Sequence, residues 1–123
     1  MFFIIKAFER GKMAGKFELT KSKGEQYHFN LKAENGEIIF SSEMYNSKSA
    51  AEKGIESVKR NAGDEKSYER RTNVNSQPFF VLKSGNAEEI GMSETYSSDS
   101  AMENGIKSLM KNAPDASISD LAQ

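Results

Sequence analysis

SEMYNSKSAAEKGIESVKRNA, residues 42–62, returns later in the chain as SETYSSDSAMENGIKSLMKNA, residues 93–113. The shift of 51 residues between these two stretches aligns the copies without a gap, and identities continue upstream to Phe29 and Phe80. A gapless register over roughly forty residues indicates an internal duplication. The repeated positions that we expect to carry the structure are Tyr45, Gly54, Ile55, Tyr96, Gly105 and Ile106.

Each copy predicts three strands followed by a helix. The segments KFELTK, QYHFNLK and GEIIFSS precede the first helix, and YERRTN, PFFVLK and EIGMS take the same places before the second. Most of these segments alternate apolar and polar residues, which is typical of a strand buried on one face. Asn35-Gly36 predicts a type I′ hairpin turn, which needs positive φ at both central residues, and Gly85-Asn86 is predicted to turn the second hairpin.

Both helices are predicted to be amphipathic. Candidate N-caps are Ser47 or Ser49 in the first helix and Ser98 or Ser100 in the second, and the sequence does not separate them. The expected buried stripes are Ala50, Ala51, Gly54, Ile55, Val58 and Ala62, and Ala101, Met102, Gly105, Ile106, Leu109 and Ala113. A glycine inside a helix costs about 1 kcal/mol relative to alanine. Its presence in both copies indicates close packing of the helix backbone, not a ligand site.

One repeat is too small to fold well by itself. About fifty residues that give three strands and one helix leave a sheet edge unpaired and bury a thin core. We therefore predict an α+β fold in which two tandem βββα repeats form one antiparallel sheet with pseudo-twofold symmetry and both helices packed on one face. The repeats span residues 16–64 and 67–115 of a single domain at 13–123, with a C-terminal tail at 116–123. Because Met13-Ala14-Gly15 has the form of a translation start, we interpret residues 1–12 as an N-terminal extension.

The repeated phrases resemble a known family. The stretch AENGEIIFSSEMYNSKSAAEKGIESVKRNA, its partner ending in LMKNAPDA and the beginning MAGKFEL are similar to the YegP-like proteins, the DUF1508 or UPF0339 family, in a tandem-repeat form. The resemblance implies repeats that merge into one sheet and exchange a terminal strand, for which Ala116–Leu121 is the only candidate. It implies no activity, because the family is named for its lack of an assigned function. The second copy departs from the first at Arg70, Gly91 and Met92, where the first has Leu19, Phe40 and Ser41.

Composition argues against several classes of function. A net charge of −1 and a pI of about 5.9 lack the basic excess typical of proteins that coat nucleic acid or anionic membranes. With no cysteine there is no disulfide and no thiolate metal site. The apolar run at residues 2–5 is too short for a signal peptide or a membrane span. We expect a cytoplasmic bacterial protein, a monomer or weak homodimer, with no metal, cofactor or membrane contact.

No arrangement of residues predicts catalysis. His28 is the one histidine, and no motif places a nucleophile or an orienting acid beside it. The carboxylates lack the spacing of a calcium site. Glu37, Glu43, Glu88 and Glu94 recur in both copies, which turn polarity and helix electrostatics would also produce. We therefore predict no catalytic residue and rank an enzyme third among the possible functions.

The sheet face opposite the helices is the predicted binding surface. Four sizeable apolar side chains on an open face are more than chance requires. One interpretation is a surface covered by the protein's own termini or by a weak dimer contact. A second is a docking surface for a protein, peptide or small ligand, and a third is stacking of single-stranded nucleic acid. The residues expected on this face are His28, Asn30, Ile38, Phe40, Arg71, Phe79 and Val81.

Overall fold

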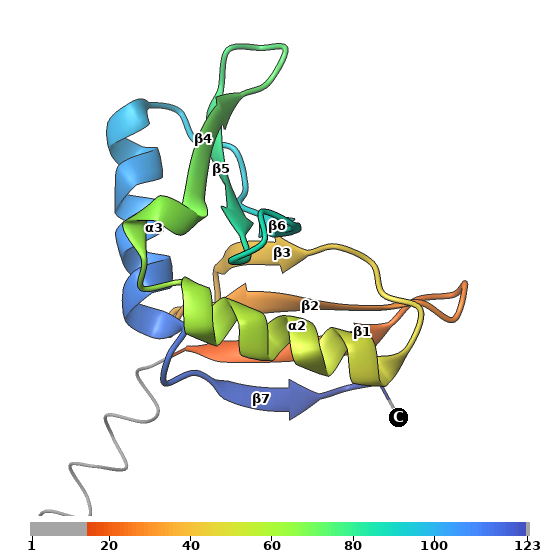
Figure 1. Ribbon diagram of the computed structural model, residues 1–123. Coiled ribbons are helices and arrows are strands. Elements are labelled where there is room, and N and C mark those ends of the chain that lie inside the picture. The colour runs from red at the N-terminus through yellow and green to blue at the C-terminus, as the bar shows by residue number, and fades with distance from the viewer. Residues whose placement is uncertain (1–14, 123) are drawn as a thin grey trace, which may run out of the picture.

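The computed structural model describes residues 15–122, which form one open sheet of seven strands with two helices packed against it (Figure 1). The strand order is β4-β5-β6-β3-β2-β1-β7. The elements are β1 (Lys16–Lys21), β2 (Tyr27–Lys32), β3 (Ile38–Ser42), α2 (Lys48–Asn61), the 3₁₀ turn η1 (Glu65–Ser67), β4 (Tyr68–Thr72), β5 (Pro78–Lys83), β6 (Glu89–Met92), α3 (Asp99–Asn112) and β7 (Ser117–Asp120). The predicted pair of βββα units in one sheet is confirmed. Residues 1–12, predicted to be an extension, lie outside the described residues.

The terminal strand is exchanged between the repeats, as the resemblance implied. β7 follows the helix of the second repeat and pairs in parallel with β1 of the first, with Leu19 opposite Asp120. The Leu121 N–H donates to the Leu19 carbonyl at 2.8 Å, and Asp120 forms an ion pair with Lys48 at the start of α2. The sheet is therefore antiparallel except at this one edge.

The two repeats share one hydrophobic core. α2 contacts β2 of its own repeat and also β5 and β6 of the other, while α3 contacts β5 and β3. Phe17 and Phe29 of the first repeat belong to the same buried cluster as Phe80 of the second, and all three are fully buried. Because each helix covers strands of both repeats, neither repeat encloses its own core.

The repeats meet at the pairing of β3 with β6. Ser41 lies opposite Met92, which is its own equivalent in the second repeat, so the pseudo-twofold axis passes through this pair. One step away, Gly91 lies opposite Ser42, and the ring of Phe40, its repeat equivalent, reaches it. A Cβ atom built on Gly91 would lie 2.7 Å from the Phe40 Cζ and 2.8 Å from the Ser42 Cα, and closer still to the Ser41 carbonyl oxygen. The Phe40 ring thus fills the space that a second side chain would need.

The first hairpin loop differs from the predicted type I′ turn. Gly36 has φ of 88°, but Asn35 does not have positive φ, and the loop is closed by bonds from the Ala33 N–H to the Glu37 carbonyl (2.8 Å) and from the Gly36 N–H to the Ala33 carbonyl (2.9 Å). A longer loop with one left-handed residue is the next most common hairpin connection. The type I′ prediction for Asn35-Gly36 was therefore wrong. In the second repeat Gly85-Asn86 lies at the centre of the turn, as predicted, which the Ala87 N–H closes by bonding to the Ser84 carbonyl at 2.9 Å, and Ala87 has φ of 71°.

Both helices begin at the first of the two candidate caps. The Ser47 hydroxyl accepts from the Ala50 N–H at 3.0 Å, and the Ser98 hydroxyl accepts from the Ala101 N–H at 3.0 Å. The two mid-helix glycines pack as predicted, since a Cβ atom on Gly54 would lie 2.8 Å from the Cζ of Tyr45. At Gly105 the corresponding distance to Tyr96 is 2.6 Å. Each glycine therefore makes room for a tyrosine ring on the helix backbone.

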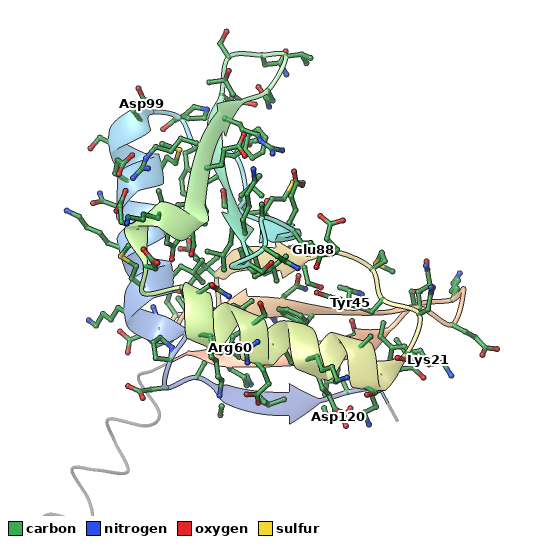
Figure 2. All side chains as sticks on the ribbon, viewed as in Figure 1. Lys21, Tyr45, Arg60, Glu88, Asp99 and Asp120 are labelled. Carbon is green, nitrogen blue, oxygen red and sulfur yellow. The ribbon has the colours of Figure 1, made fainter. Side chains whose placement is uncertain are left out.

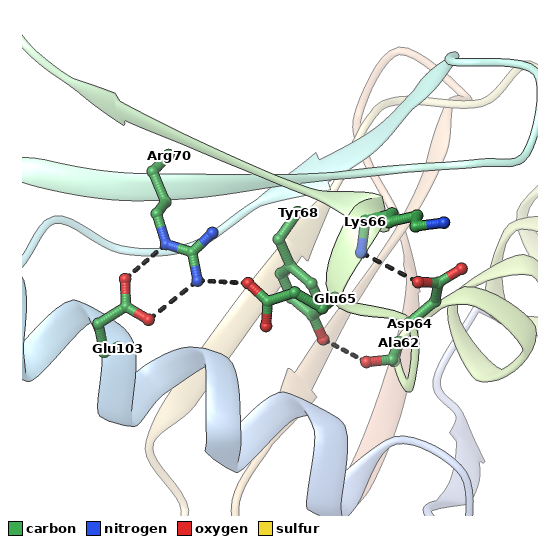
Figure 3. Close-up of polar contacts among 7 residues, drawn as sticks. All are labelled: Ala62, Asp64, Glu65, Lys66, Tyr68, Arg70 and Glu103. Atoms are coloured by element: carbon green, nitrogen blue, oxygen red, sulfur yellow. Dashed lines mark hydrogen bonds and ion pairs between the residues drawn. The ribbon is translucent and has the colours of Figure 1, made fainter.

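The free edge of the sheet carries an ion-pair cluster (Figure 3). Arg70 of β4 is the equivalent of Leu19, which is fully buried in β1 beside β7. Its Nη2 atom donates to Glu103 of α3 at 2.9 Å and to Glu65 at 2.8 Å. Nearby, the Tyr68 hydroxyl donates to the Ala62 carbonyl at 2.6 Å, and burial raises the pKa of Tyr68. At this edge, which no strand covers within residues 15–122, a paired arginine that can face water stands where the first repeat has a buried leucine.

Replacing either mid-helix glycine with valine should destabilise the protein by at least about 2 kcal/mol, because the added side chain collides with the tyrosine ring and β-branching disfavours the helix. Urea unfolding of Gly54→Val and Gly105→Val measures this loss. Gly63→Ala is the matched control, because nothing lies within 4 Å of its Cβ position. We expect that change to stay within about 0.5 kcal/mol of the parent. Equal effects at all three glycines would contradict the packing role.

Gly91→Ala should destabilise the protein at the junction of the repeats, by roughly 2 kcal/mol or more, because the methyl group meets the Phe40 ring and the neighbouring backbone. In a Phe40→Leu background the cost of Gly91→Ala should fall, since one of the opposing groups is smaller. A double-mutant cycle by urea unfolding measures the coupling, and additivity within about 0.5 kcal/mol would show that the two sites do not compete for space.

Candidate functional site

Two open clefts, one beside each helix, are lined by residues that the repeat relates to one another. The α3 cleft has a volume of about 770 Å³ and the α2 cleft about 470 Å³. All ten residues that line the α2 cleft are repeat equivalents of residues that line the α3 cleft. Six equivalent pairs of residues line both clefts: Glu37, Ile39, Glu94, Tyr96, Gly105 and Ser108 in the α3 cleft, and Glu88, Ile90, Glu43, Tyr45, Gly54 and Ser57 in the α2 cleft.

Each cleft is built from both repeats. In the α2 cleft, Tyr45 and the helix belong to the first repeat, whereas Glu88 and Ile90 come from the β5–β6 hairpin of the second. The α3 cleft reverses this arrangement. Figure 2 labels Arg60 on α2, Tyr45 just before this helix and Glu88 in the β5–β6 hairpin of the other repeat. The clefts therefore exist only when the two repeats are joined.

Packing fixes the tyrosine in each cleft. The Tyr45 ring stacks on Phe29 with centroids 6.2 Å apart and planes at 10°, and the Tyr96 ring stacks on Phe80 at 6.5 Å and 13°. The Tyr45 backbone N–H and carbonyl both bond to Tyr27, at 2.7 and 2.8 Å. With a phenylalanine stacked on the ring and a helix glycine against its hydroxyl end, each tyrosine has a defined position in its cleft.

A serine positions the first carboxylate of each cleft. The Ser42 hydroxyl accepts from the Phe29 N–H at 2.9 Å and donates to the Glu43 carbonyl at 2.7 Å. Ser93 makes the same two bonds, to Phe80 at 3.0 Å and to Glu94 at 2.8 Å. This contact ties the backbone of the acidic residue to the neighbouring strand in both repeats.

The tyrosine hydroxyls lie among carboxylates. Burial raises the pKa of Tyr45, and the negative charges of Glu43 and Glu88 raise it further. Burial likewise raises the pKa of Tyr96, with added repulsion from Glu94 and Glu37. In each cleft one carboxylate comes from the same repeat as the tyrosine and the other from the opposite repeat. The hydroxyl stays protonated at neutral pH and can donate a hydrogen bond.

The four cleft glutamates, Glu37, Glu43, Glu88 and Glu94, form no ion pair with any other residue in the range 15–122. The sheet carboxylates differ, because those on β1, β4 and β6 are all paired with lysine or arginine. The α2 cleft is also lined by Lys53, whose equivalent in the α3 cleft is Asn104. The α3 cleft is the larger of the two. The α2 cleft is also lined by Glu89, which offsets the charge of Lys53 but is itself paired with Arg71.

Each cleft adjoins a second hollow that carries basic residues. The α3 cleft shares Ser108 with a hollow of about 350 Å³ lined by Lys107 and Lys111. The α2 cleft shares Ser57 with a hollow of about 600 Å³ lined by Arg60. Acidic residues continue into both hollows, as Glu34 beside α3 and the shared Glu88 beside α2. The basic end of each groove is therefore defined by its cations alone, Lys107 and Lys111 or Arg60, and this mixed lining suits an extended ligand of mixed charge.

The predicted open-face residues do not form one apolar surface. His28 lies beside Thr20, whose hydroxyl is 3.2 Å from its Nε2 atom, and Asn30 is half-buried. Arg71 bonds to Glu69 at 2.9 Å and to Glu89 at 2.7 Å. Phe79 is half-buried and Ile38 is exposed. The face therefore carries paired charges between scattered apolar side chains.

Two residues predicted on the open face are buried. Phe40 is fully buried in the core, because a β-bulge shifts the register beside Leu31 and Lys32 and turns both Ile39 and Phe40 inward. The prediction that Phe40 faces outward was wrong for this reason. Val81 lies between Glu69 and Met92 on the neighbouring strands and is also fully buried. On the open face, the longer side chains of Glu69 in β4 and Met92 in β6 flank Val81.

Sequence analysis did not assign the cleft glutamates to a site. Their recurrence at the same positions of both repeats was visible, but turn polarity and helix electrostatics explained it equally well. The missing information was the crossing of the helices between repeats, which places Glu88 beside Tyr45 although the two are far apart in the sequence. Repetition of exposed charged residues was the signal that could have found them.

The described part of the chain contains no group of three or more His, Cys, Asp or Glu residues that could hold a metal ion. Within residues 15–122 no helix is both long and apolar enough to cross a membrane.

Comparison with known proteins gives consistent matches. The family described as "Domain of unknown function (DUF1508)" matches residues 22–69 and again 73–120. The UPF0339 protein YegP of Yersinia pestis is 55% identical over 107 residues, which cover 87% of this chain and 96% of that protein. The solution NMR structure of a UPF0339 protein from Shewanella oneidensis, 47% identical, aligns with a TM-score of 0.84 over 89% of this chain and 93% of that one. The NMR structure of YegP from E. coli, a protein of unknown function, is 45% identical and gives a TM-score of 0.83 over 88% and 93% of the two chains.

Removing a cleft carboxylate should lower the pKa of the tyrosine in the same cleft. We expect Glu88→Gln to lower the pKa of Tyr45, although the two residues belong to different repeats, and to leave that of Tyr96 unchanged. Glu37→Gln should do the reverse. The tyrosine ¹³Cζ chemical shift, followed by NMR as the pH rises past 10, measures both values in one sample. A response of neither tyrosine would show that the carboxylates lie too far away.

Proposed function

The chain belongs to the DUF1508 family, the UPF0339 proteins of unknown function, and from the geometry of its clefts we propose that it is a non-catalytic binding protein of the bacterial cytoplasm. In this proposal each groove takes an extended peptide segment of a partner protein. A lysine or arginine side chain of the segment enters the Glu–Tyr end. A carboxylate further along the same segment lies near the basic end.

One observation carries the proposal: the four cleft glutamates are repeated, exposed and without an ion-pair partner among the described residues. Two carboxylates suit a guanidinium or ammonium group, which forms charge-assisted hydrogen bonds with them. The tyrosine ring and the isoleucine on the opposite wall provide apolar surface for the methylene chain of the same side chain. The neutral phenol and the helix serine supply additional polar contacts.

Two equivalent grooves favour a partner with two basic segments. When both segments belong to one molecule, binding of the first raises the effective concentration of the second, so modest single-site affinities combine. The clefts are open, with the walls of each cleft supplied by different repeats, which suits a side chain more than a small molecule that must be enclosed.

Catalysis is not supported by the residues present. Among residues 15–122, His28 has Thr20 as its side-chain partner, and no carboxylate forms a hydrogen bond with a serine, threonine or tyrosine hydroxyl. Single-stranded nucleic acid is also disfavoured as a ligand, because the open-face Arg71 is held by two glutamates and the clefts are acidic. The open sheet face is the second candidate surface, favoured by the exposed Ile38 and Met92.

Titration of ¹⁵N-labelled protein with a short peptide that contains one arginine and one glutamate tests the proposal. We expect amide shifts at Tyr96 and Gly105 first and at Tyr45 and Gly54 at higher peptide concentration, because the α3 cleft lacks a counterpart of Lys53. Glu94→Gln should weaken the first response by about tenfold or more. Lys53→Asn, which restores the repeat equivalent, should strengthen the second.

Glu18→Gln is the matched control, since Glu18 lies on the open face and should leave peptide binding unchanged. An acidic peptide and a single-stranded oligonucleotide should cause no shifts in the clefts. Shifts that gather at His28, Asn30 and Phe79 would favour the open face instead. Absence of any shift with the arginine peptide at millimolar concentration would contradict the proposal.

A further inference from the structure

The outer edge of β4 has no neighbouring strand within the described residues, whereas the equivalent edge of β1 is covered by β7. The carbonyl groups of Pro78 and Phe80 accept bonds from Tyr96 and Ser93, so they point away from β4. β5 therefore forms its backbone hydrogen bonds to β4 through Phe79 and Val81, which lie opposite Arg71 and Glu69. It follows that the backbone groups of Arg70, at the middle of β4, point outward from the sheet.

We propose that two copies of this chain associate by antiparallel pairing of β4 with β4, about a twofold axis at Arg70. Arg70 of each copy then exchanges its N–H and carbonyl with Arg70 of the other, and Tyr68 lies opposite Thr72. The sheet of one copy continues into the sheet of the second. The β1 edge of the same fold already accepts an added strand through the equivalent residue, because the Leu121 N–H donates to the Leu19 carbonyl at 2.8 Å.

Charge complementarity identifies the occupant as a second copy. With Arg70 on the axis, Glu69 of one copy lies opposite Arg71 of the other, and this contact occurs twice. Within one copy, Arg71 is held by Glu69 at 2.9 Å and by Glu89 at 2.7 Å, so both side chains are already positioned on the open face. A shift of register would place like charges opposite each other. The edge is thus self-complementary in one register.

Arg70 does not oppose this pairing. Each guanidinium is bound by Glu103 at 2.9 Å and by Glu65 at 2.8 Å on the helix side of the sheet, so two such clusters meeting at the axis present no unpaired positive charge (Figure 3). A charged edge normally discourages strand addition. Here the arrangement of charges favours a second copy of the chain in one register. The exposed Arg70 side chain keeps this association reversible. The expected product is a weak homodimer.

Charge reversal provides a test that folding defects do not imitate. Sedimentation velocity of the full chain should show association that increases with concentration. Glu69→Arg and Arg71→Glu should each weaken self-association by at least tenfold, because like charges then meet twice. A one-to-one mixture of the two variants should associate again, since one chain presents two positive and the other two negative side chains. Glu18→Arg, on the covered edge of the sheet, should associate like the parent.

Amide hydrogen exchange of the unmodified chain gives a second measurement. The Arg70 N–H should exchange several-fold more slowly at high than at low protein concentration, while the Leu19 N–H should not change. A chain that remains monomeric at millimolar concentration would overturn the proposal. So would a mixture of folded reversal variants that shows no restored association.

Discussion

The structure depends on the contact between β3 and β6, where the two repeats join. At this seam the Phe40 ring lies over Gly91, and the helices of both repeats cross to cover strands of the other. A single repeat has too few apolar residues to close a core and leaves a strand edge bare. The contact between β3 and β6 corrects both defects. It pairs the inner strand edges and brings the aromatic residues of the two repeats into one buried cluster.

The candidate site is a consequence of the same seam. The hairpin of one repeat reaches the helix of the other, so each cleft receives one carboxylate from each half of the chain. The residues that make the helix fit closely also shape the cleft: Gly54 lets the hydroxyl end of Tyr45 approach the helix, and Phe29 stacks on the Tyr45 ring. The same residues therefore stabilise the fold and form the candidate binding surface. Because the chain needs two repeats to close its core, it also carries two clefts.

Local sequence patterns predicted the helices and strands. They failed for residues whose burial or contacts depend on strands that are distant in the sequence. Alternation and capping serines located the strands and helices, and the repeated glycines indicated close packing correctly. The inward turn of Phe40 depends on a β-bulge between β2 and β3, which strict alternation along one strand does not contain. The burial of Val81 depends on neighbours in β4 and β6. The pairing of Glu88 with Tyr45 depends on the crossing of the helices, so no spacing in the sequence could indicate it.

The departures from perfect repetition are as informative as the identities. Two phenylalanines cannot occupy one seam beside a twofold axis, so Phe40 is matched by Gly91. β7 covers the edge of β1, whereas no strand among residues 15–122 covers that of β4. Leu19, fully buried beside β7, accordingly corresponds to Arg70, which faces water through its pairs with Glu65 and Glu103. Symmetry was lost where the described residues supply one partner strand for two equivalent positions. It was kept more closely at the clefts, where the tyrosine, the two glutamates, the helix glycine and the serine recur in both copies although Lys53 is matched by Asn104.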